Sequence, residues 1–307
     1  MKPPPFEYVA PRSLDEAVAA LANGGPDARL LAGGQSLIPL LNFRLARPSL
    51  LVDLNRVPEL AHVTPRDGGV ALGAMTRQAR VERSRSLAEA QPLLVEAIRW
   101  VGHAAIRSRG TIGGSLAHAD PAAELPAVVV CLDAQLGVVG PRGGRTIAAQ
   151  DFFVGYLSSA LAPDEILVET WLPPVKPRTG QAWLEFARRH GDFALAGVSV
   201  SLSVQDEQVV DARIVLTGVG GGKPVRAGDA ETLLLGGSAT DRAQAAADAV
   251  RDTVRPDADI HASSEYRAHL AAVLTARATR IAYQRALTRA PAALDVRRAL
   301  EAMSRRA

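Results

Sequence analysis

The chain has 307 residues, of which 48% are apolar and 22% are charged. This length and composition predict a globular protein that buries a sizeable core in two or three domains. The formal net charge is only +3, and basic residues are not concentrated or interleaved with aromatic ones, so nucleic-acid binding is not expected. The single cysteine, Cys131, excludes an internal disulfide and a cysteine-ligated zinc or iron-sulfur site made by this chain alone.

The N-terminal residues 1–11 lack the apolar stretch of a signal peptide. No run of about 18 apolar residues is free of charged residues. We therefore expect a cytoplasmic protein with no membrane span.

Apolar runs and helix-like stretches alternate in the N-terminal half. Residues 28–33 predict a buried strand, residues 36–45 a helix and residues 50–54 a second strand. Residues 69–75 predict a third strand, which leads into a polar helix starting near Thr76. This alternation indicates α/β packing.

The next hundred residues continue the pattern. One longer helix is predicted over residues 86–102 and another over residues 121–132, with strands at 134–140 and 165–173. The proline-rich residues 172–180 predict a linker or domain edge.

Beyond the linker the pattern changes. Residues 198–221 predict two antiparallel strands joined by the turn residues Asp206 and Glu207. Helices are predicted over residues 239–254 and 264–287. Strands followed by helices indicate a C-terminal domain of α+β type.

Two glycine pairs, Gly33–Gly34 and Gly113–Gly114, each stand between an apolar run and a predicted helix. Such a turn exposes backbone N–H groups with no side chain in the way, and the helix N-terminus adds about half a positive charge. Each pair taken singly is also explained as an ordinary tight turn. Two pairs in one domain indicate a shared ligand that carries phosphate.

Hydroxyl groups stand beside both glycine pairs. Ser36 and Thr111 could add hydroxyl donors, and Ser115 could cap the next element or bond a second phosphate oxygen. The dinucleotide fingerprint G-x-G-x-x-G is absent from both segments, and residues 218–224 lack the Walker pattern. A Rossmann or P-loop enzyme is therefore not expected.

Three segments carry a resemblance to a known family: "AGGQSLIPLLNFRLARPSLLVDLNRV", "IRSRGTIGGSLAHADPAAELPA" and "RRHGDFALAGVSV". In this order they resemble the FAD-binding medium subunit of molybdenum hydroxylases, the family of aerobic carbon monoxide dehydrogenase and of the flavin domain of xanthine dehydrogenase. The resemblance covers nearly the whole chain.

The resemblance implies an α+β fold in two domains. Residues 1–175 would form a PCMH-type (vanillyl-alcohol-oxidase-like) two-part α/β FAD-binding domain whose subdomains divide near residues 55–65. Residues 176–290 would form a smaller α+β domain with an antiparallel sheet and helices, of the carbon monoxide dehydrogenase flavoprotein type. Residues 291–307 would be a C-terminal tail.

The resemblance also implies that the FAD pyrophosphate lies against both glycine turns. The implied cofactor-binding residues of the two turns are Leu31, Ala32, Gly33, Gly34, Gln35, Ser36, Leu37, Thr111, Ile112, Gly113, Gly114 and Ser115. Gln35 and Ser115 depart from the family, where His and Asn are usual, but both keep a polar side chain.

Three further residues match family positions near the cofactor. Asp120 and Glu124 could accept hydrogen bonds from ribose hydroxyls, or they are helix N-terminal carboxylates that favour the helix dipole. Phe193 matches a residue that covers the isoalloxazine ring, and the alternative is that it starts the core of the second domain. No catalytic residue and no metal ligand are expected in this chain.

The resemblance implies an electron-transfer subunit. Substrate would be oxidised at a molybdenum-pterin centre on a large subunit, and electrons would cross two-iron two-sulfur clusters on a small subunit to FAD and an external acceptor. The complex would be a dimer of heterotrimers, cytoplasmic or held at a membrane through the complex. The alternatives are a stand-alone FAD-dependent oxidoreductase, for which we find no clear acid or base, and a non-catalytic nucleotide-binding assembly subunit.

Overall fold

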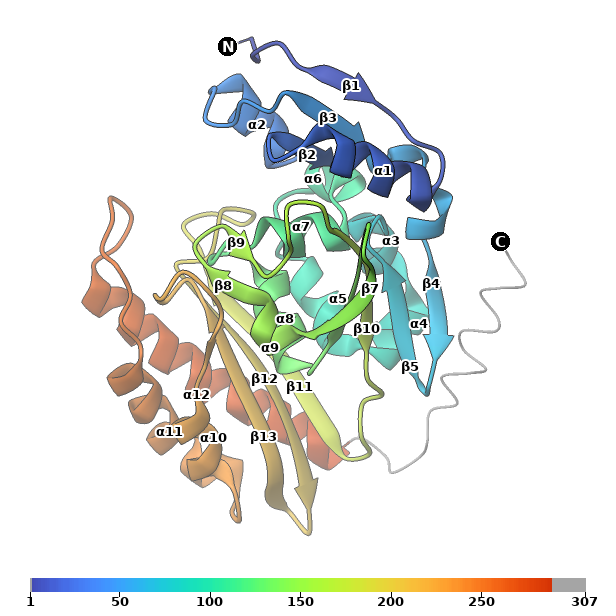
Figure 1. Cartoon of the computed structure of the whole chain (residues 1–307). Coiled ribbons are helices and arrows are strands. Elements are labelled where there is room, and N and C mark those ends of the chain that lie inside the picture. The colour runs from blue at the N-terminus through green and yellow to red at the C-terminus, as the bar shows by residue number, and fades with distance from the viewer. Residues whose placement is uncertain (1, 289–307) are drawn as a thin grey trace.

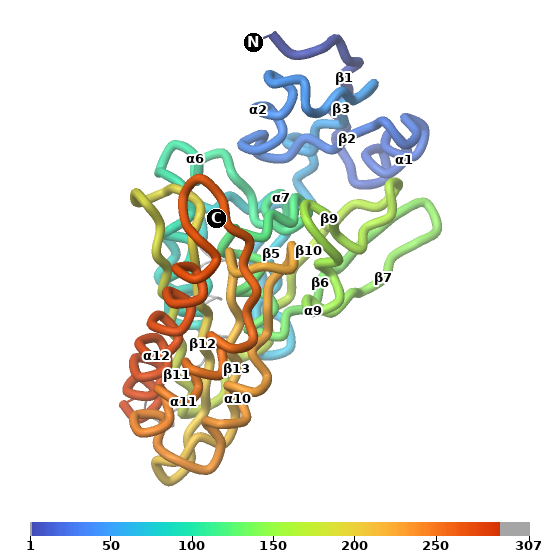
Figure 2. The backbone as a smooth tube through the Cα atoms, turned by 90° about the vertical axis from the view of Figure 1, so that its left-hand side faces the viewer, coloured from blue at the N-terminus to red at the C-terminus, as the bar shows by residue number. Residues whose placement is uncertain are grey.

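The computed structural model describes residues 2–288, and Figure 1 shows three main sheets with their helices. The first sheet lies at one end of the molecule and the C-terminal sheet at the other, as the two views agree (Figures 1 and 2). The predicted tail, residues 291–307, lies outside the described residues.

The first sheet is parallel and small, with the strand order β1-β3-β2. Its elements are β1 (Glu7–Val9), α1 (Leu14–Gly24), β2 (Ala28–Leu31), α2 (Leu37–Asn42) and β3 (Leu50–Asp53). Ser13 caps α1 by accepting the N–H of Glu16. The two predicted strands of this region are present but shorter, at 28–31 and 50–53 instead of 28–33 and 50–54. The helix predicted over residues 36–45 covers only residues 37–42.

The second sheet has five strands, in the order β4-β5-β10-β6-β7. The strands are β4 (Val63–Arg66), β5 (Gly69–Gly73), β6 (Gln135–Gly140), β7 (Gly143–Ala148) and β10 (Ile166–Leu172). All four pairings are antiparallel. Alternation along the chain therefore does not produce a parallel sheet here, because β4–β5 and β6–β7 are hairpins and β10 inserts between them.

A group of short helices carries the large apolar core beside this sheet. They are α3 (Gln78–Arg83), α4 (Arg85–Ala90), α5 (Pro92–Ile98), α6 (Ala104–Arg109), α7 (Ile112–His118) and α8 (Glu124–Cys131). Five short elements complete the region: the 3-10 turns Leu54–Arg56 and Pro58–Leu60, the helix α9 (Ala149–Phe152), and the paired strands β8 (Phe153–Gly155) and β9 (Ser158–Ser159).

The single helix predicted over residues 86–102 is wrong. The chain breaks at Gln91, whose φ and ψ are −138° and 65°, and a new helix starts at Pro92. Proline has no N–H to continue a helix and disfavours the helical conformation in the residue before it, so it is placed at a helix start instead.

The C-terminal sheet is antiparallel, with the order β11-β12-β13-β14. Its strands are β11 (Thr179–Phe186), β12 (Ala196–Gln205), β13 (Gln208–Thr217) and β14 (Val225–Arg226), and its helices are α10 (Gly228–Leu234), α11 (Ala239–Thr253) and α12 (Ser264–Thr288). The predicted turn is confirmed, because Asp206 and Glu207 both have positive φ, at 49° and 62°, and join β12 to β13.

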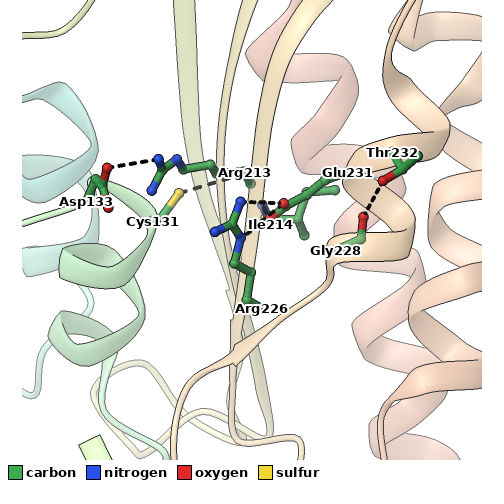
Figure 3. A network of polar contacts seen from close by, with 8 residues as sticks. All are labelled: Cys131, Asp133, Arg213, Ile214, Arg226, Gly228, Glu231 and Thr232. Carbon is green, nitrogen blue, oxygen red and sulfur yellow. Dashed lines mark hydrogen bonds and ion pairs between the residues drawn. The ribbon is translucent and has the colours of Figure 1, made fainter. Parts of the chain in front are cut away.

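The C-terminal sheet lies between two sets of helices. The helix α12 packs on β11 and β12, with α11 beside it, while α5 and α8 of the N-terminal half approach the sheet as well. Trp183 of β11 is buried in the large N-terminal core. Figure 3 shows a polar link across the same boundary, where Arg213 of β13 donates to Asp133 at 2.9 Å. The two halves therefore share a packed boundary.

Candidate functional site

The first glycine turn, residues 32–36, joins the end of β2 at Leu31 to the start of α2 at Leu37. Gly34 has a φ of +74°, a conformation that side chains disfavour. Among residues 2–288, no acceptor is found for the backbone N–H groups of Gly34, Gln35 and Ser36, and the Ser36 hydroxyl makes no cap hydrogen bond. This turn therefore offers free donors for an anion.

The second glycine turn is different, because the protein already uses its backbone N–H groups. Thr111 caps α7, and its Oγ1 accepts the N–H of Gly114 at 3.0 Å. Three other N–H groups donate within the protein: Ile112 to the Thr76 carbonyl, Gly113 to the Ala74 carbonyl and Ser115 to the Thr111 carbonyl. The side-chain donors left to a ligand here are the hydroxyls of Ser115 and of Thr111, which is only 2% exposed.

The structure brings the two turns into contact. A Cβ on Gly33 would lie 2.4 Å from the carbonyl oxygen of Arg109, and one on Gly114 would lie 3.2 Å from the Cβ of Ala32. A Cβ on Gly113 would lie 2.4 Å from the Cβ of Ala74. These glycines therefore allow close packing of the two turns.

Two polar residues that the sequence analysis missed link the turns. Asn55 donates from Nδ2 to the Ala32 carbonyl at 2.9 Å, and Arg77 donates to Asn55 Oδ1 and to the Arg109 carbonyl. Burial, followed by the charge of Arg109, lowers the pKa of the Arg77 guanidinium. Both residues border a hollow of about 200 Å³. The signal in the sequence is their place shortly after a predicted strand, where α/β proteins often position ligand-binding residues.

Asp120 and Glu124 follow the second turn but differ in their surroundings. Asp120 accepts the Ala122 N–H at 2.9 Å in a local turn. Glu124 is only 5% exposed, and burial, followed by the nearby Glu185, raises its pKa to about 8. Burial therefore favours the neutral form of Glu124, which is the first residue of α8.

Glu185 of β11 is the second buried carboxyl group in this region. Its Oε2 accepts from Trp183 Nε1 at 3.0 Å, while Oε1 has no hydrogen-bond partner in the described part of the chain. Burial raises its pKa to about 7. The sequence analysis did not single out this residue, because its position opposite Glu124 depends on the packing of the two domains.

Phe193 lies in the loop between β11 and β12 and is 61% exposed. The alternative that it starts the core of the second domain is therefore wrong. The buried Arg267 of α12 holds the end of this loop by donating to the Leu195 carbonyl at 2.8 Å and to the Gly218 carbonyl at 3.3 Å. Its other terminal nitrogen pairs with Asp259 at 2.7 Å.

The loop that carries Phe193 lies against the segment before α6, where His190 stacks on Trp100 with ring centroids 5.4 Å apart. Gly191 packs on His103 in the same place. The two glycine turns are thus one unit, and Phe193 belongs to a separate exposed loop.

Within the described residues, no group of three or more His, Cys, Asp or Glu side chains is arranged to hold a metal ion. Over the same residues, none of the helices is both long and apolar enough to cross a membrane.

Two touching glycine turns, followed by an antiparallel sheet packed with helices, make up a two-domain α+β protein whose first turn offers backbone N–H donors to an anion. Residues 4–175 match the family described as the FAD binding domain in molybdopterin dehydrogenase. Residues 181–282 match the carbon monoxide dehydrogenase flavoprotein C-terminal domain.

Individual relatives agree with both matches. The chain is 43% identical to the 6-hydroxypseudooxynicotine dehydrogenase complex subunit alpha of Paenarthrobacter nicotinovorans, over 93% of this chain and 97% of that protein. It superposes on a chain of carbon monoxide dehydrogenase from Hydrogenophaga pseudoflava with a TM-score of 0.90 and 39% identity, covering 93% and 99% of the two chains. For quinoline 2-oxidoreductase of Pseudomonas putida 86 the TM-score is 0.89 and the identity 40%, covering 94% and 100%.

The chain therefore belongs to the family of FAD-binding medium subunits of carbon monoxide dehydrogenase and related molybdenum hydroxylases. The residues present fit the pyrophosphate of FAD at the first turn, which combines three free N–H groups with a glycine where a side chain would be strained. At the second turn the fit depends on hydroxyl groups.

Proposed function

We propose that this chain is the flavin electron-transfer subunit of a heteromeric molybdenum hydroxylase. It would receive electrons from two-iron two-sulfur clusters on a small subunit and deliver them to an external acceptor. Substrate would be oxidised at a molybdenum-pterin centre on a large subunit, in a cytoplasmic dimer of heterotrimers. When bound, FAD supplies the electron chemistry, and the protein supplies its orientation and electrostatic surroundings.

The observation that carries this proposal is the contact between the two glycine turns. Backbone N–H groups of Gly34, Gln35 and Ser36 would bind phosphate oxygens, and the hydroxyls of Thr111 and Ser115 would complete the site. Leu31, Leu37 and Ile112 flank the turns, and Ile112 is only 1% exposed, so its role would be to fix the second turn in the core.

The remaining predicted site residues have separate proposed roles. Glu124, neutral at pH 7, could donate as well as accept a hydrogen bond toward the cofactor, and Asp120 would shape the segment between α7 and α8. Phe193 would cover the isoalloxazine ring, for which its exposure leaves it available.

The proposed domain division is 1–175, with subdomains that divide near 55–65, followed by 176–290. Supporting it, the chain leaves the first sheet at Asp53 and enters the second at Val63, and the C-terminal sheet begins at Thr179.

The relatives are named for different substrates, from 6-hydroxypseudooxynicotine to quinoline and carbon monoxide. Chains with the same fold thus occur in enzymes named for different substrates, which supports the proposal that this chain does not itself select the substrate. The name "complex subunit alpha" supports a heteromeric assembly.

The test is purification of the tagged chain from its native host, with mass spectrometry of the associated proteins and an absorbance spectrum. We expect a flavin spectrum, together with a large subunit that carries molybdenum and a small subunit that carries iron. A yellow protein that stays alone and oxidises a substrate would support the stand-alone enzyme. A colourless protein that still binds the other subunits would support the assembly subunit.

A further inference from the structure

The segment directly after the first glycine turn presents an unusual surface. Phe43 is 65% exposed, Leu45 is 76% exposed and Ile38 of α2 is 40% exposed. We call Ile38, Phe43, Arg44, Leu45 and Arg47 the α2 patch. The helix α2 lies at the end of the molecule opposite the C-terminal sheet, as Figures 1 and 2 show.

The chain holds this patch in a defined shape. The Leu45 N–H donates to the Leu40 carbonyl at 2.9 Å and the Arg44 N–H to the Leu41 carbonyl at 3.0 Å, the two hydrogen bonds of a Schellman motif. In this motif the residue at the Leu45 position usually packs back on the helix, but here it points into solvent. The exposure of Leu45 is therefore fixed by backbone hydrogen bonds.

Arg44 occupies the left-handed position of the motif, with a φ of 58°, where glycine is the usual residue. A non-glycine residue in this conformation costs on the order of 1 kcal/mol. The chain thus keeps an arginine where glycine would be more stable, and such strain often marks a functional position.

The charged residues around the patch are all basic. Residues 28–52 contain three arginines and no Asp or Glu. Arg44 and Arg47, with Lys2 and three prolines, line a shallow hollow of about 330 Å³ that has no carboxylate in its wall. Neither arginine forms an ion pair with any described residue.

We propose that the α2 patch docks a protein subunit of the hydroxylase complex through an apolar face rimmed by carboxylates. This inference rests on the proposed function. Large exposed apolar side chains are typical of permanent interfaces, and two arginines that have no ion pair with a described residue favour negative charge opposite them. A second copy of this chain fits less well, because a two-fold contact would bring the arginines of both copies together.

The experiment uses the full chain co-expressed with the large and small subunits. Leu45→Glu introduces a carboxylate into the apolar centre of the patch. We expect this variant to lower the amount of partner subunit that co-purifies with each chain by about tenfold or more. Val210→Glu is the matched control, because Val210 is 54% exposed on β13, in the sheet at the other end of the molecule. The control should retain partner as the wild type does.

A second variant separates docking from folding. Arg44→Gly relieves the left-handed strain, so its melting temperature should be equal to or above that of the wild type. Because it also removes a charge, its complex should dissociate at lower salt than the wild-type complex.

Three outcomes would overturn the proposal. The first is Leu45→Glu retaining partner at the wild-type ratio. The second is a partner-free wild-type chain that forms a dimer dissociated by Leu45→Glu, which would assign the patch to a second copy. The third is retention of nucleic acid on the patch in place of protein. A wild-type chain that brings down no subunit would instead overturn the proposed function and this docking site together.

Discussion

Because Gly33 has no side chain, the first glycine turn can lie close to Arg109, just before the second glycine turn. Any Cβ there would meet the backbone carbonyl of Arg109 at 2.4 Å, and a backbone atom cannot move aside as a flexible side chain can. Gly34 acts differently, because the turn needs a positive φ of 74° there, and glycine adopts it without the steric cost that a Cβ would add. Two adjacent glycines thus serve two separate physical requirements.

Gly33→Ala should lower both stability and FAD retention. The added methyl would push the turns apart at a cost of about 1–3 kcal/mol, and the separation would remove the shared site for phosphate. Thermal unfolding and the flavin-to-protein absorbance ratio would measure the two effects. Gly155→Ala is the control, since a Cβ there meets no atom within 4 Å. Full flavin occupancy in Gly33→Ala would contradict a shared site.

Phe193→Ala should change the flavin more than it changes the fold. The side chain is 61% exposed, so its removal leaves little cavity and the melting temperature should stay close to that of the wild type. If the ring covers the isoalloxazine, flavin fluorescence and reduction potential should both shift while occupancy stays high. Unchanged fluorescence and potential would remove Phe193 from the site.

At the scale of elements, the start of α8 and the end of β11 place two carboxyl groups in a buried region between the domains. Glu124 is 5% exposed and Glu185 is 7% exposed. Burial raises the pKa of Glu124 to about 8 and that of Glu185 to about 7, above the ordinary value of 4.5. The folded state therefore holds protons that the unfolded chain has already released.

The stability contributed by these two protonated groups should be fully present below pH 4.5 and should be lost as the pH rises through 7 to 8. Glu124→Gln keeps the shape of the side chain but cannot ionise, so the stability of this variant should fall less than that of the wild type as the pH rises. Thermal unfolding at pH 5 and pH 8 would measure it, with the exposed Glu7→Gln as control. An equal decline in wild type and Glu124→Gln would contradict the raised pKa.

The molecule as a whole combines the proposed phosphate site with a single cysteine, Cys131, which is buried. One cysteine cannot ligate an iron-sulfur cluster, so the proposed route brings electrons from a partner subunit. The Cys131 thiol is fully enclosed beside β13, and burial raises its pKa far above the ordinary value. It is therefore an inert structural thiol in the junction that Figure 3 shows.

The partner-free chain loaded with FAD should be inert toward hydroxylase substrates. Dithionite should bleach its flavin absorbance, whereas carbon monoxide, purines and N-heterocycles should leave it unchanged until the large and small subunits are added. Anaerobic absorbance spectroscopy would measure both. Direct bleaching by one of these substrates without partners would support the stand-alone oxidoreductase instead.

Local signals in the sequence determined several features by themselves. Asp206 is a residue type that tolerates positive φ, and it stands between two strand-like runs, so the C-terminal hairpin could be predicted. The glycine pairs showed where a backbone must come close to a ligand or to another segment. Three motifs in order were enough to identify the family, which the comparisons confirm.

How the protein uses those signals depends on contacts that form on folding. The N–H groups of Ile112 and Gly113 looked free in the sequence, but Thr76 and Ala74 from a distant strand end accept them. The link from Arg77 through Asn55, the antiparallel second sheet and the buried neighbours of Glu124 likewise depend on contacts between residues far apart in the chain. Local propensity cannot specify such contacts, because the free energy that selects them comes from the packing of the whole core.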